Sequence, residues 1–215
     1  MSGYFDCIVI GAGAVGTAAA YHLATRGHKV VALDPHPPGH DKGSSHGDTR
    51  VIRLVYFEHP DYVPLLKRAF TLWQELDDRS ETALFTQTGI LQSGPREGKV
   101  IAGIRQAAET HGLLIEPLTA TDVSNTYPGF HLRDGDEALF DPNGGILAVE
   151  DCVRSHAEFA TAAGASINVG ERAMQWQEKN GQVQVVTEAG NYTADRLIVS
   201  PGAWAPGLLP ATRRY

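Results

Sequence analysis

The clearest pattern along the chain is a short apolar run, a glycine-rich turn, an alanine-rich segment and a second apolar run, all within the first 34 residues. Residues 7–10 and 29–33 have the near-continuous apolar character of strands buried on both faces of a parallel sheet. Residues 17–26 are predicted to form a helix that ends at Gly27. We therefore expect a strand–turn–helix–strand unit with Asp34 at the end of its second strand.

The middle of the chain mixes helical and extended patterns after a loop over 35–45 that is rich in proline, glycine and serine. Helical apolar spacing and short apolar runs between turn residues distinguish the two kinds of element. The expected helices cover residues 61–76, with Asp61 as cap, 99–111 and 121–127. The expected extended segments cover 84–91, 113–118, 138–140 and 146–148, the last two around an Asn143-Gly144-Gly145 turn.

The last third predicts a helix over 150–163, a strand over 166–169 and then strands only. Three strands near 172–178, 182–188 and 191–194, separated by Asn180-Gly181 and Ala189-Gly190 turns, form an antiparallel meander. A buried strand over 197–200 then leads into Pro201-Gly202-Ala203-Trp204.

Composition narrows the class of protein. The 215 residues are 42% hydrophobic and 20% charged, which is typical of a globular chain of one domain, or of one domain with an inserted lobe. A net charge of −7 argues against nucleic acid or an anionic membrane as partner. There is no apolar run of membrane-spanning length and no secretory signal pattern. Two distant cysteines predict neither disulfides nor a zinc site, and favour the reducing cytoplasm.

The glycine-rich turn carries the candidate chemistry. Gly11, Gly13 and Gly16 have the Gly-x-Gly-x-x-Gly spacing of a dinucleotide-binding turn, here between a strand and a helix. The first glycine allows the tight turn, the second lets a pyrophosphate approach the backbone, and the third lets helix and strand pack closely. Asp34 is expected to accept hydrogen bonds from an adenosine ribose and to repel the 2′-phosphate of NADP. The cofactor-binding residues predicted here are Gly11, Gly13, Ala14, Val15, Gly16, Asp34 and Pro35.

FAD and NAD both fit this unit, and the downstream pattern favours FAD. A long loop, a mixed region and a meander follow the second strand, where a doubly wound NAD dehydrogenase continues with alternating strands and helices. The predicted fold is α/β: a Rossmann-like FAD/NAD(P)-binding domain with an inserted mixed α+β portion of a substrate lobe and an antiparallel β-meander. We expect the FAD-binding domain over 1–83 and 148–210, and part of the substrate-binding domain over 84–147.

A family resemblance follows from the block Gly43-Ser44-Ser45-His46-Gly47-Asp48-Thr49-Arg50-Val51-Ile52-Arg53. Together with the glycine turn and Asp34, it resembles the monomeric sarcosine oxidase and N-methyl-tryptophan oxidase family, which are FAD amine oxidases of the D-amino-acid-oxidase-like superfamily. The segments 62–65, 85–89, 193–200 and Gly202-Ala203-Trp204 are similar to this family as well. The resemblance implies that an N-methyl or cyclic amino acid loses hydride to FAD, and that dioxygen reoxidises the flavin to give hydrogen peroxide.

The resemblance also implies roles for individual residues. Arg50 is expected close to the isoalloxazine with His46 nearby, and Arg53 is expected to pair with the substrate carboxylate. Additional cofactor contacts are implied for Ser44, Ser45, Thr49, Ala173, Ser200, Gly202 and Trp204. Without the family block, His46 reads as an exposed loop residue and the two arginines as a solvated face, sharing one side if the segment is helical.

Three interpretations of the length remain open, because the resemblance implies that family members are much longer. The chain is one piece of an enzyme whose C-terminal half is a second chain, a truncated product that binds flavin poorly, or a small flavin- or NAD-binding module without turnover. The resemblance places the cysteine that attaches FAD in the absent half, and neither Cys7 nor Cys152 matches it. Both cysteines read as core residues. His36, His40 and His46 have no standard metal-ligand spacing.

Overall fold

The computed structural model describes residues 3–209, which form two compact units. Unit 1 contains the described residues up to Thr49 and those from Ala148 onward, and unit 2 contains Arg50–Leu147. The second division coincides with the predicted boundary between 147 and 148. The first division comes well before the predicted boundary at 83/84, because residues 50–83 pack with unit 2. The functional roles of the two domains stay predictions.

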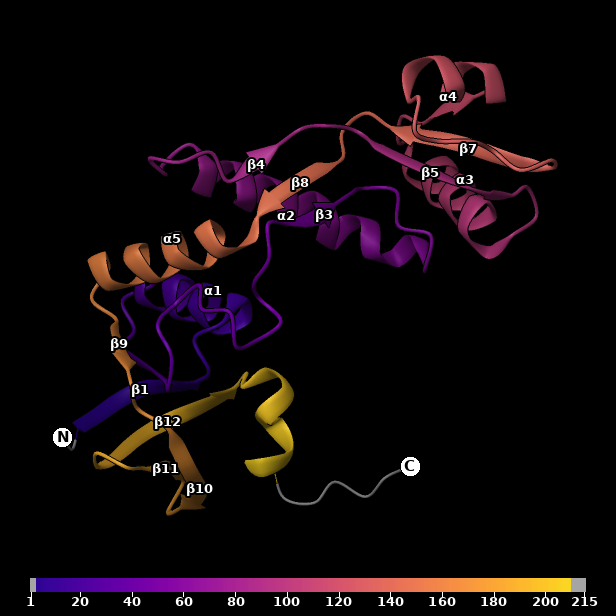
Figure 1. Cartoon of the computed structure of the whole chain (residues 1–215). Coiled ribbons are helices and arrows are strands. Elements are labelled where there is room, and N and C mark those ends of the chain that lie inside the picture. The colour runs from indigo at the N-terminus through magenta and orange to yellow at the C-terminus, as the bar shows by residue number, and fades with distance from the viewer. Residues whose placement is uncertain (1–2, 210–215) are drawn as a thin grey trace. The chain divides into compact units, whose positions relative to one another are not determined.

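Unit 1 is built on a six-stranded mixed sheet with the strand order β10-β11-β12-β1-β2-β9. β12, β1, β2 and β9 run parallel, and β10, β11 and β12 form the antiparallel meander (Figure 1). The strands are β1 (Gly3–Ile10), β2 (Val30–Asp34), β9 (Ser166–Val169), β10 (Ala173–Lys179), β11 (Gln182–Thr187) and β12 (Asn191–Val199). The helices are α1 (Ala14–Ala24), α5 (Val149–Ala162) and the 3-10 helix η2 (Gly202–Gly207).

The central strand β1 is buried on both faces, as its apolar run predicts. Cys7 and Val9 face α1 and α5, where they pack with small residues such as Ala20 and Ala160. Ile8 and Ile10 face the opposite side and join a cluster with residues of the meander strands. The strand from which the glycine turn follows is therefore fixed by apolar packing on both of its faces.

The predicted secondary structure of unit 1 is largely confirmed, with one clear difference. Residues 191–194 and 197–200 were expected in two separate strands, but β12 is continuous over Asn191–Val199. Its first half pairs antiparallel with β11, and it pairs parallel with β1 from Gly3↔Tyr192 to Ile10↔Val199, with a break at Asp195. Long-range pairing thus carries the strand through the polar residues at its middle.

Unit 2 contains two three-stranded sheets, β3-β8-β4 and β5-β7-β6. Its helix α3 packs on the second sheet, where Ile101 and Ile104 contact a core with Leu139. The strands are β3 (Thr49–Ile52), β4 (Phe85–Thr86), β5 (Ile90–Pro95), β6 (Glu116–Leu118), β7 (Asp136–Asp141) and β8 (Gly145–Ala148). The helices are η1 (Pro60–Tyr62), α2 (Val63–Asp77), α3 (Lys99–His111) and α4 (Ala120–Thr126).

Three features of unit 2 differ from the sequence analysis. The His59 side chain, not Asp61, caps η1, and α2 begins without a side-chain cap. β3 is a strand in which Arg50 lies, with Arg53 just after it, so the helical i, i+3 spacing of these arginines does not apply. The strands β7 and β8 on either side of the Asn143-Gly144-Gly145 turn belong to different sheets.

His156 is a buried titratable side chain on α5, beside Tyr21 of α1, and its Nδ1 lies 3.0 Å from the carbonyl oxygen of Cys152. Burial is the main cause that lowers the pKa of His156 to about 4, with a smaller contribution from His22. An unfolded histidine has a pKa near ~6.5, so between these two values the unfolded chain binds the extra proton. Stability is therefore lost as the pH falls from about 6.5 through about 4.

We expect this histidine alone to account for roughly 3 kcal/mol of acid destabilisation over that window. The variant His156→Gln should flatten the pH dependence, measured by urea unfolding at several pH values, although its stability near neutral pH will be lower. His28→Gln, at a half-exposed histidine, serves as the control and should keep the dependence of the parent chain. An unchanged slope in His156→Gln would contradict the assignment.

Candidate functional site

The glycine turn after β1 has the geometry that a dinucleotide-binding turn requires. Gly11 has φ +95°, a conformation that favours glycine. A Cβ on Gly16 would collide with the carbonyl oxygen of Gly11, so this glycine allows α1 to lie close to the turn. A Cβ on Gly13 would meet nothing closer than the Ser45 Oγ, at 3.4 Å. The backbone at Gly13 is therefore open for the close approach of a ligand.

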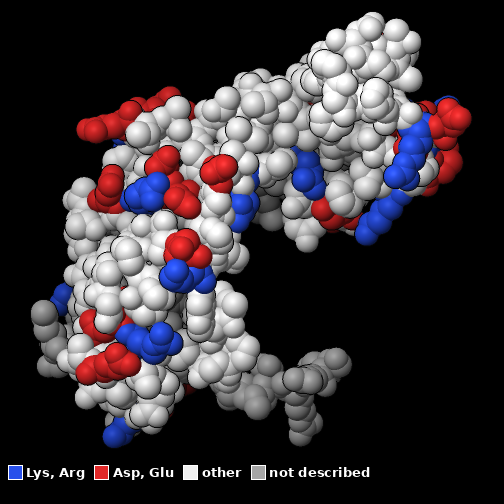
Figure 2. Space-filling view, viewed as in Figure 1, with Lys and Arg blue, Asp and Glu red and all other residues white. Residues whose placement is uncertain are grey.

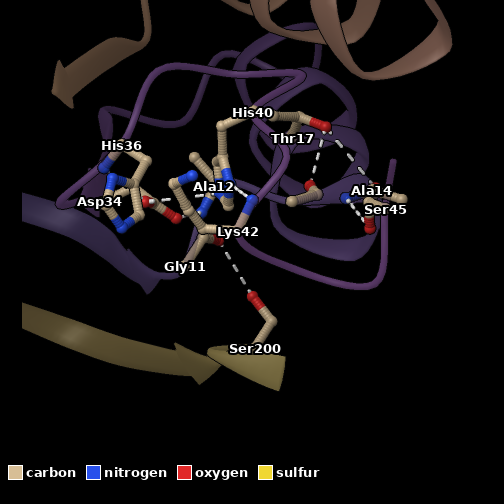
Figure 3. A network of polar contacts seen from close by, with 11 residues as sticks. Gly11, Ala12, Ala14, Thr17, Asp34, His36, His40, Lys42, Ser45 and Ser200 are labelled. Carbon is tan, nitrogen blue, oxygen red and sulfur yellow. Dashed lines mark hydrogen bonds and ion pairs between the residues drawn. The ribbon is translucent and has the colours of Figure 1, made fainter. Parts of the chain in front are cut away.

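The N-terminus of α1 offers backbone donors to the same space. Gly13 is the N-cap and supplies no side-chain hydrogen bond to the helix. The N–H of Ala14 donates to the Ser45 Oγ at 3.2 Å (Figure 3). A polar oxygen thus already lies at the first turn of α1, where the free N–H groups and the helix dipole favour a phosphate.

Asp34, at the end of β2, lies against the glycine turn (Figure 3). Its Oδ2 accepts from the N–H of Ala12 at 2.7 Å, and its Oδ1 accepts from the N–H of His36 at 2.8 Å. A carboxylate offers about four lone-pair positions, so it retains acceptor capacity beyond these two bonds. Asp34 is thus held in place by the backbone and is still able to bind a sugar hydroxyl.

β12 closes the other side of the turn. The Ser200 hydroxyl is 3.1 Å from the carbonyl oxygens of both Ile10 and Gly11 and donates to them. Figure 3 shows the contact with Gly11. The N–H of Ser200 also donates to the carbonyl oxygen of Ile10. The end of β12 therefore fixes the carbonyls of the turn and leads directly into η2.

The loop between β2 and Thr49 is held by α5. The N–H of Gly47 donates to Glu150 Oε1 at 3.2 Å, and Arg154 Nη1 lies 3.7 Å from Glu150 Oε2. Arg154 also packs against Gly39, where an added Cβ would come within 2.7 Å of its Nη1. The first two turns of α5 thus position the loop that carries Ser44 and Ser45.

A carboxylate network links the end of β2 to the meander. Glu171 is 8% exposed and accepts hydrogen bonds from Thr187 at 2.6 Å, Tyr192 at 2.8 Å and Asn168 at 3.0 Å. Burial raises the pKa of Glu171, but these three donors outweigh burial, and the pKa lies below its ordinary value. The N–H of Glu171 donates to the carbonyl oxygen of Asp34. The network therefore joins the meander to the end of β2.

These elements enclose a groove of about 600 Å³ within unit 1. Twelve of the predicted cofactor-binding residues line it, namely Gly11, Gly13, Ala14, Val15, Asp34, Pro35, Ser44, Ser45, Ala173, Ser200, Gly202 and Trp204. Gly16 is buried in the first turn of α1, where it lets the helix lie close to the carbonyl oxygen of Gly11. The structure thus brings together residues that are up to 193 positions apart in the sequence (Gly11 and Trp204) on one surface.

The remaining predicted residues lie outside the lining of this groove. His46 and Thr49 are exposed in unit 1, and Arg50 is exposed at the start of unit 2. Arg53, also in unit 2, pairs with Glu58 at 3.3 Å, and its guanidinium lies over the rings of Tyr56 and Phe57. Arg53 Nε is buried and has no hydrogen-bond partner among the described residues. The catalytic roles implied for His46, Arg50 and Arg53 stay predictions.

Several lining residues were missed by the sequence analysis. They come from the 35–45 loop, α5, the segment around β10 and the residues near η2, and include His36, Gly39, His40, Gly43, Val153, Arg172, Met174, Pro201, Gly207 and Leu208. The short spacing of His36 and His40 after Asp34 was an available signal. Arg172 and Met174 flank the predicted Ala173, and only the crossing of the meander brings them to the groove.

The distribution of charged and apolar side chains adds three observations. On the face shown in Figure 2, acidic and basic side chains are interspersed, without a large basic patch. Within residues 3–209, no three His, Cys, Asp or Glu side chains are grouped to hold a metal ion. No helix in that part of the chain is both long and apolar enough to cross a bilayer.

Known proteins are similar to this chain in sequence and in fold. The chain is 41% identical to monomeric sarcosine oxidase from Bacillus sp. (strain B-0618) over 210 residues, which are 97% of the chain and 54% of that protein. It is 34% identical to N-methyl-L-tryptophan oxidase from Salmonella dublin, covering 96% of the chain and 55% of that protein. The chain thus spans about half the length of the curated relatives it matches.

A solved structure gives the same picture. NikD, described as an unusual amino acid oxidase essential for nikkomycin biosynthesis, superimposes in its open form with a TM-score of 0.84 and 30% identity. The match covers 96% of this chain and 53% of NikD. The family model described as FAD dependent oxidoreductase matches residues 6–214. With the glycine turn, Asp34 and the meander all in place, the chain belongs to the FAD dependent oxidoreductase family, DAO.

Proposed function

We propose that the groove of unit 1 binds the adenosine diphosphate half of FAD, and that the whole protein oxidises N-methyl amino acids. The observation that carries the proposal is the open backbone at Gly13, next to the N-terminus of α1 and opposite the retained acceptor positions of Asp34. The pyrophosphate fits the first feature and the ribose fits the second. Similarity to sarcosine and N-methyl-tryptophan oxidases supports the substrate class.

The chemistry at the other end of the cofactor is proposed from the family resemblance. Bound FAD would supply a hydride acceptor for the carbon next to the substrate nitrogen. Arg53 is proposed to hold the substrate carboxylate through its guanidinium, whose Nε retains an unused donor. Arg50 and His46 are proposed to lie near the flavin, with Thr49 contacting the same part. Dioxygen is the proposed acceptor and hydrogen peroxide the proposed product.

Turnover is proposed for the whole protein, or for this chain with a second chain that supplies the remaining half. This chain covers only about half the length of its curated relatives. A flavin- or NAD-binding module without turnover is therefore the second candidate. The proposed location is the cytoplasm, on the ground that the sequence has only two distant cysteines. Both Cys7 and Cys152 are buried free thiols in the structure.

Cofactor binding tests the proposal directly. We expect the purified chain to bind FAD, followed by flavin absorbance and fluorescence, with ADP competing for the site and FMN competing far more weakly. NAD binding without FAD binding would support the second candidate. Sarcosine added without oxygen should bleach the bound flavin of the complete enzyme. If the whole protein binds FAD and sarcosine does not bleach it, the proposed reaction is overturned, and the proposed binding of FAD stands.

A further inference from the structure

His40 lies in the groove beside Asp34, on the loop that follows β2 (Figure 3). The N–H of His40 donates to the carbonyl oxygen of Pro37, and its ring lies against the ring of His36 with centroids 4.8 Å apart. Asp34 in turn accepts from the N–H of His36. The loop therefore holds the His40 side chain at a fixed place, and only 14% of that side chain is exposed.

The backbone selects one tautomer of His40. The N–H of Lys42 donates to His40 Nδ1 at 2.9 Å, so Nδ1 is an acceptor and carries no proton. In the neutral ring the proton must then be on Nε2. The imidazole thus presents an N–H donor on the edge that faces Asp34.

The gap between these two groups is informative. His40 Nε2 and Asp34 Oδ1 are 4.0 Å apart, which is too far for a direct hydrogen bond. A hydroxyl oxygen that hydrogen-bonds to both atoms, at about 2.8 Å from each, spans such a gap. It would accept from the Nε2–H and donate to the carboxylate. The Oδ1 atom has a lone pair for this, since among residues 3–209 it accepts a hydrogen bond only from the N–H of His36.

We propose that His40 is a specificity-determining residue for the cofactor. Its Nε2–H donates a hydrogen bond to one hydroxyl of the adenosine ribose, and the same hydroxyl donates to the Asp34 carboxylate. This inference rests on the proposed binding of FAD in the groove. A phosphate on that hydroxyl would face the Asp34 carboxylate, so the pair selects an unmodified ribose. The competing explanation is that His40 only holds the loop through Lys42.

The test is a double-mutant-type cycle in which His40 is replaced in the protein and one ribose hydroxyl is removed from the ligand. Calorimetry measures the affinities for ADP, 2′-deoxy-ADP and 3′-deoxy-ADP. The parent chain should prefer ADP over one of the deoxy analogues. In His40→Phe, which keeps an aromatic side chain but has no ring nitrogen, this preference should shrink about three- to tenfold, the effect of one lost hydrogen bond. Asp34 still accepts from the hydroxyl, so part of the preference should remain.

Two further variants make the result decisive. His40→Gln restores an N–H donor and should recover part of the preference for ADP. His28→Phe is the matched control, because His28 pairs with Asp6 at 3.8 Å outside the groove, and it should behave like the parent. The same preference in His40→Phe as in the parent, for both deoxy analogues, would overturn the role of His40 alone. A parent chain that binds neither ADP nor FAD would overturn the proposed function as well.

Discussion

Replacing Gly13 by valine is expected to lower FAD affinity by about 100-fold or more, while the chain stays folded. Gly13 has φ −76°, which any residue adopts, and an added Cβ would meet only Ser45, at 3.4 and 3.9 Å. The protein itself therefore tolerates the larger side chain. The isopropyl group would instead occupy the space through which a pyrophosphate reaches the backbone at the start of α1.

The measurement is a titration with FAD, followed by flavin fluorescence, with thermal unfolding as the check on folding. Gly13→Ala should give an intermediate affinity, because one methyl group fills less of the same space. Gly129→Val is the control, since a Cβ at Gly129 has no neighbour within 4 Å and lies in unit 2. Parent-like FAD affinity in Gly13→Val would refute the interpretation of the glycine turn.

Replacing Gly16 by alanine is expected to destabilise the fold by roughly 3 kcal/mol or more. The new Cβ would collide with the carbonyl oxygen of Gly11 and lie 2.9 Å from the Ser200 Oγ. Ser200 itself donates to that same carbonyl, so neither neighbour can move without breaking the link between β12 and the turn. α1 would have to shift away from the sheet.

Urea unfolding measures this loss, and Tm should fall by about 6–12 °C for a chain of this size. Gly13→Ala makes the same substitution three residues earlier, without a collision, and is the matched control for stability. The substitutions at the two glycines should therefore have different effects. A larger side chain at position 13 lowers cofactor affinity, and one at position 16 lowers the stability of the fold. A Gly16→Ala variant as stable as the parent would contradict the close approach of α1.

Local signals predicted much of this fold. The helix over 99–111 is observed with the same limits as α3, and Gly112 ends it with φ +60°. The Asn180-Gly181 turn of the meander has positive φ at both residues, as such a turn requires. In these segments the apolar period and the turn residues are sufficient, because neither depends on distant parts of the chain.

The differences arise where distant pairing decides the structure. The polar residues Asp195 and Arg196 interrupt the apolar pattern, yet β12 continues through them because β1 pairs with it on both sides of Asp195. Asp195 also accepts a hydrogen bond from the Tyr4 hydroxyl on the surface. β3 was not predicted either, because its exposed residues Thr49, Arg50 and Val51 carry no buried periodicity.

The candidate site also has a part that local signals predict and a part that depends on distant contacts. The glycine turn and Asp34 are found from spacing, since one continuous strand–turn–helix–strand unit positions them. Ser45 and Ser200 were found only through the family resemblance. His40 was considered for metal binding and set aside, and its position beside Asp34 depends on how the loop of residues 35–45 closes. Spacing alone contains no information about that closure.

The hydrogen bond between Gly47 and Glu150 bears on how unit 2 is inserted into the chain of unit 1. It ties together the places where the chain leaves unit 1, after Thr49, and returns to it, at Ala148. Neighbouring entry and exit points are what domain insertion needs, and closing a longer loop between them costs little additional entropy. We therefore expect the inserted segment to tolerate changes in length, and a short linker in its place to leave the six-stranded sheet and the groove of unit 1 in place.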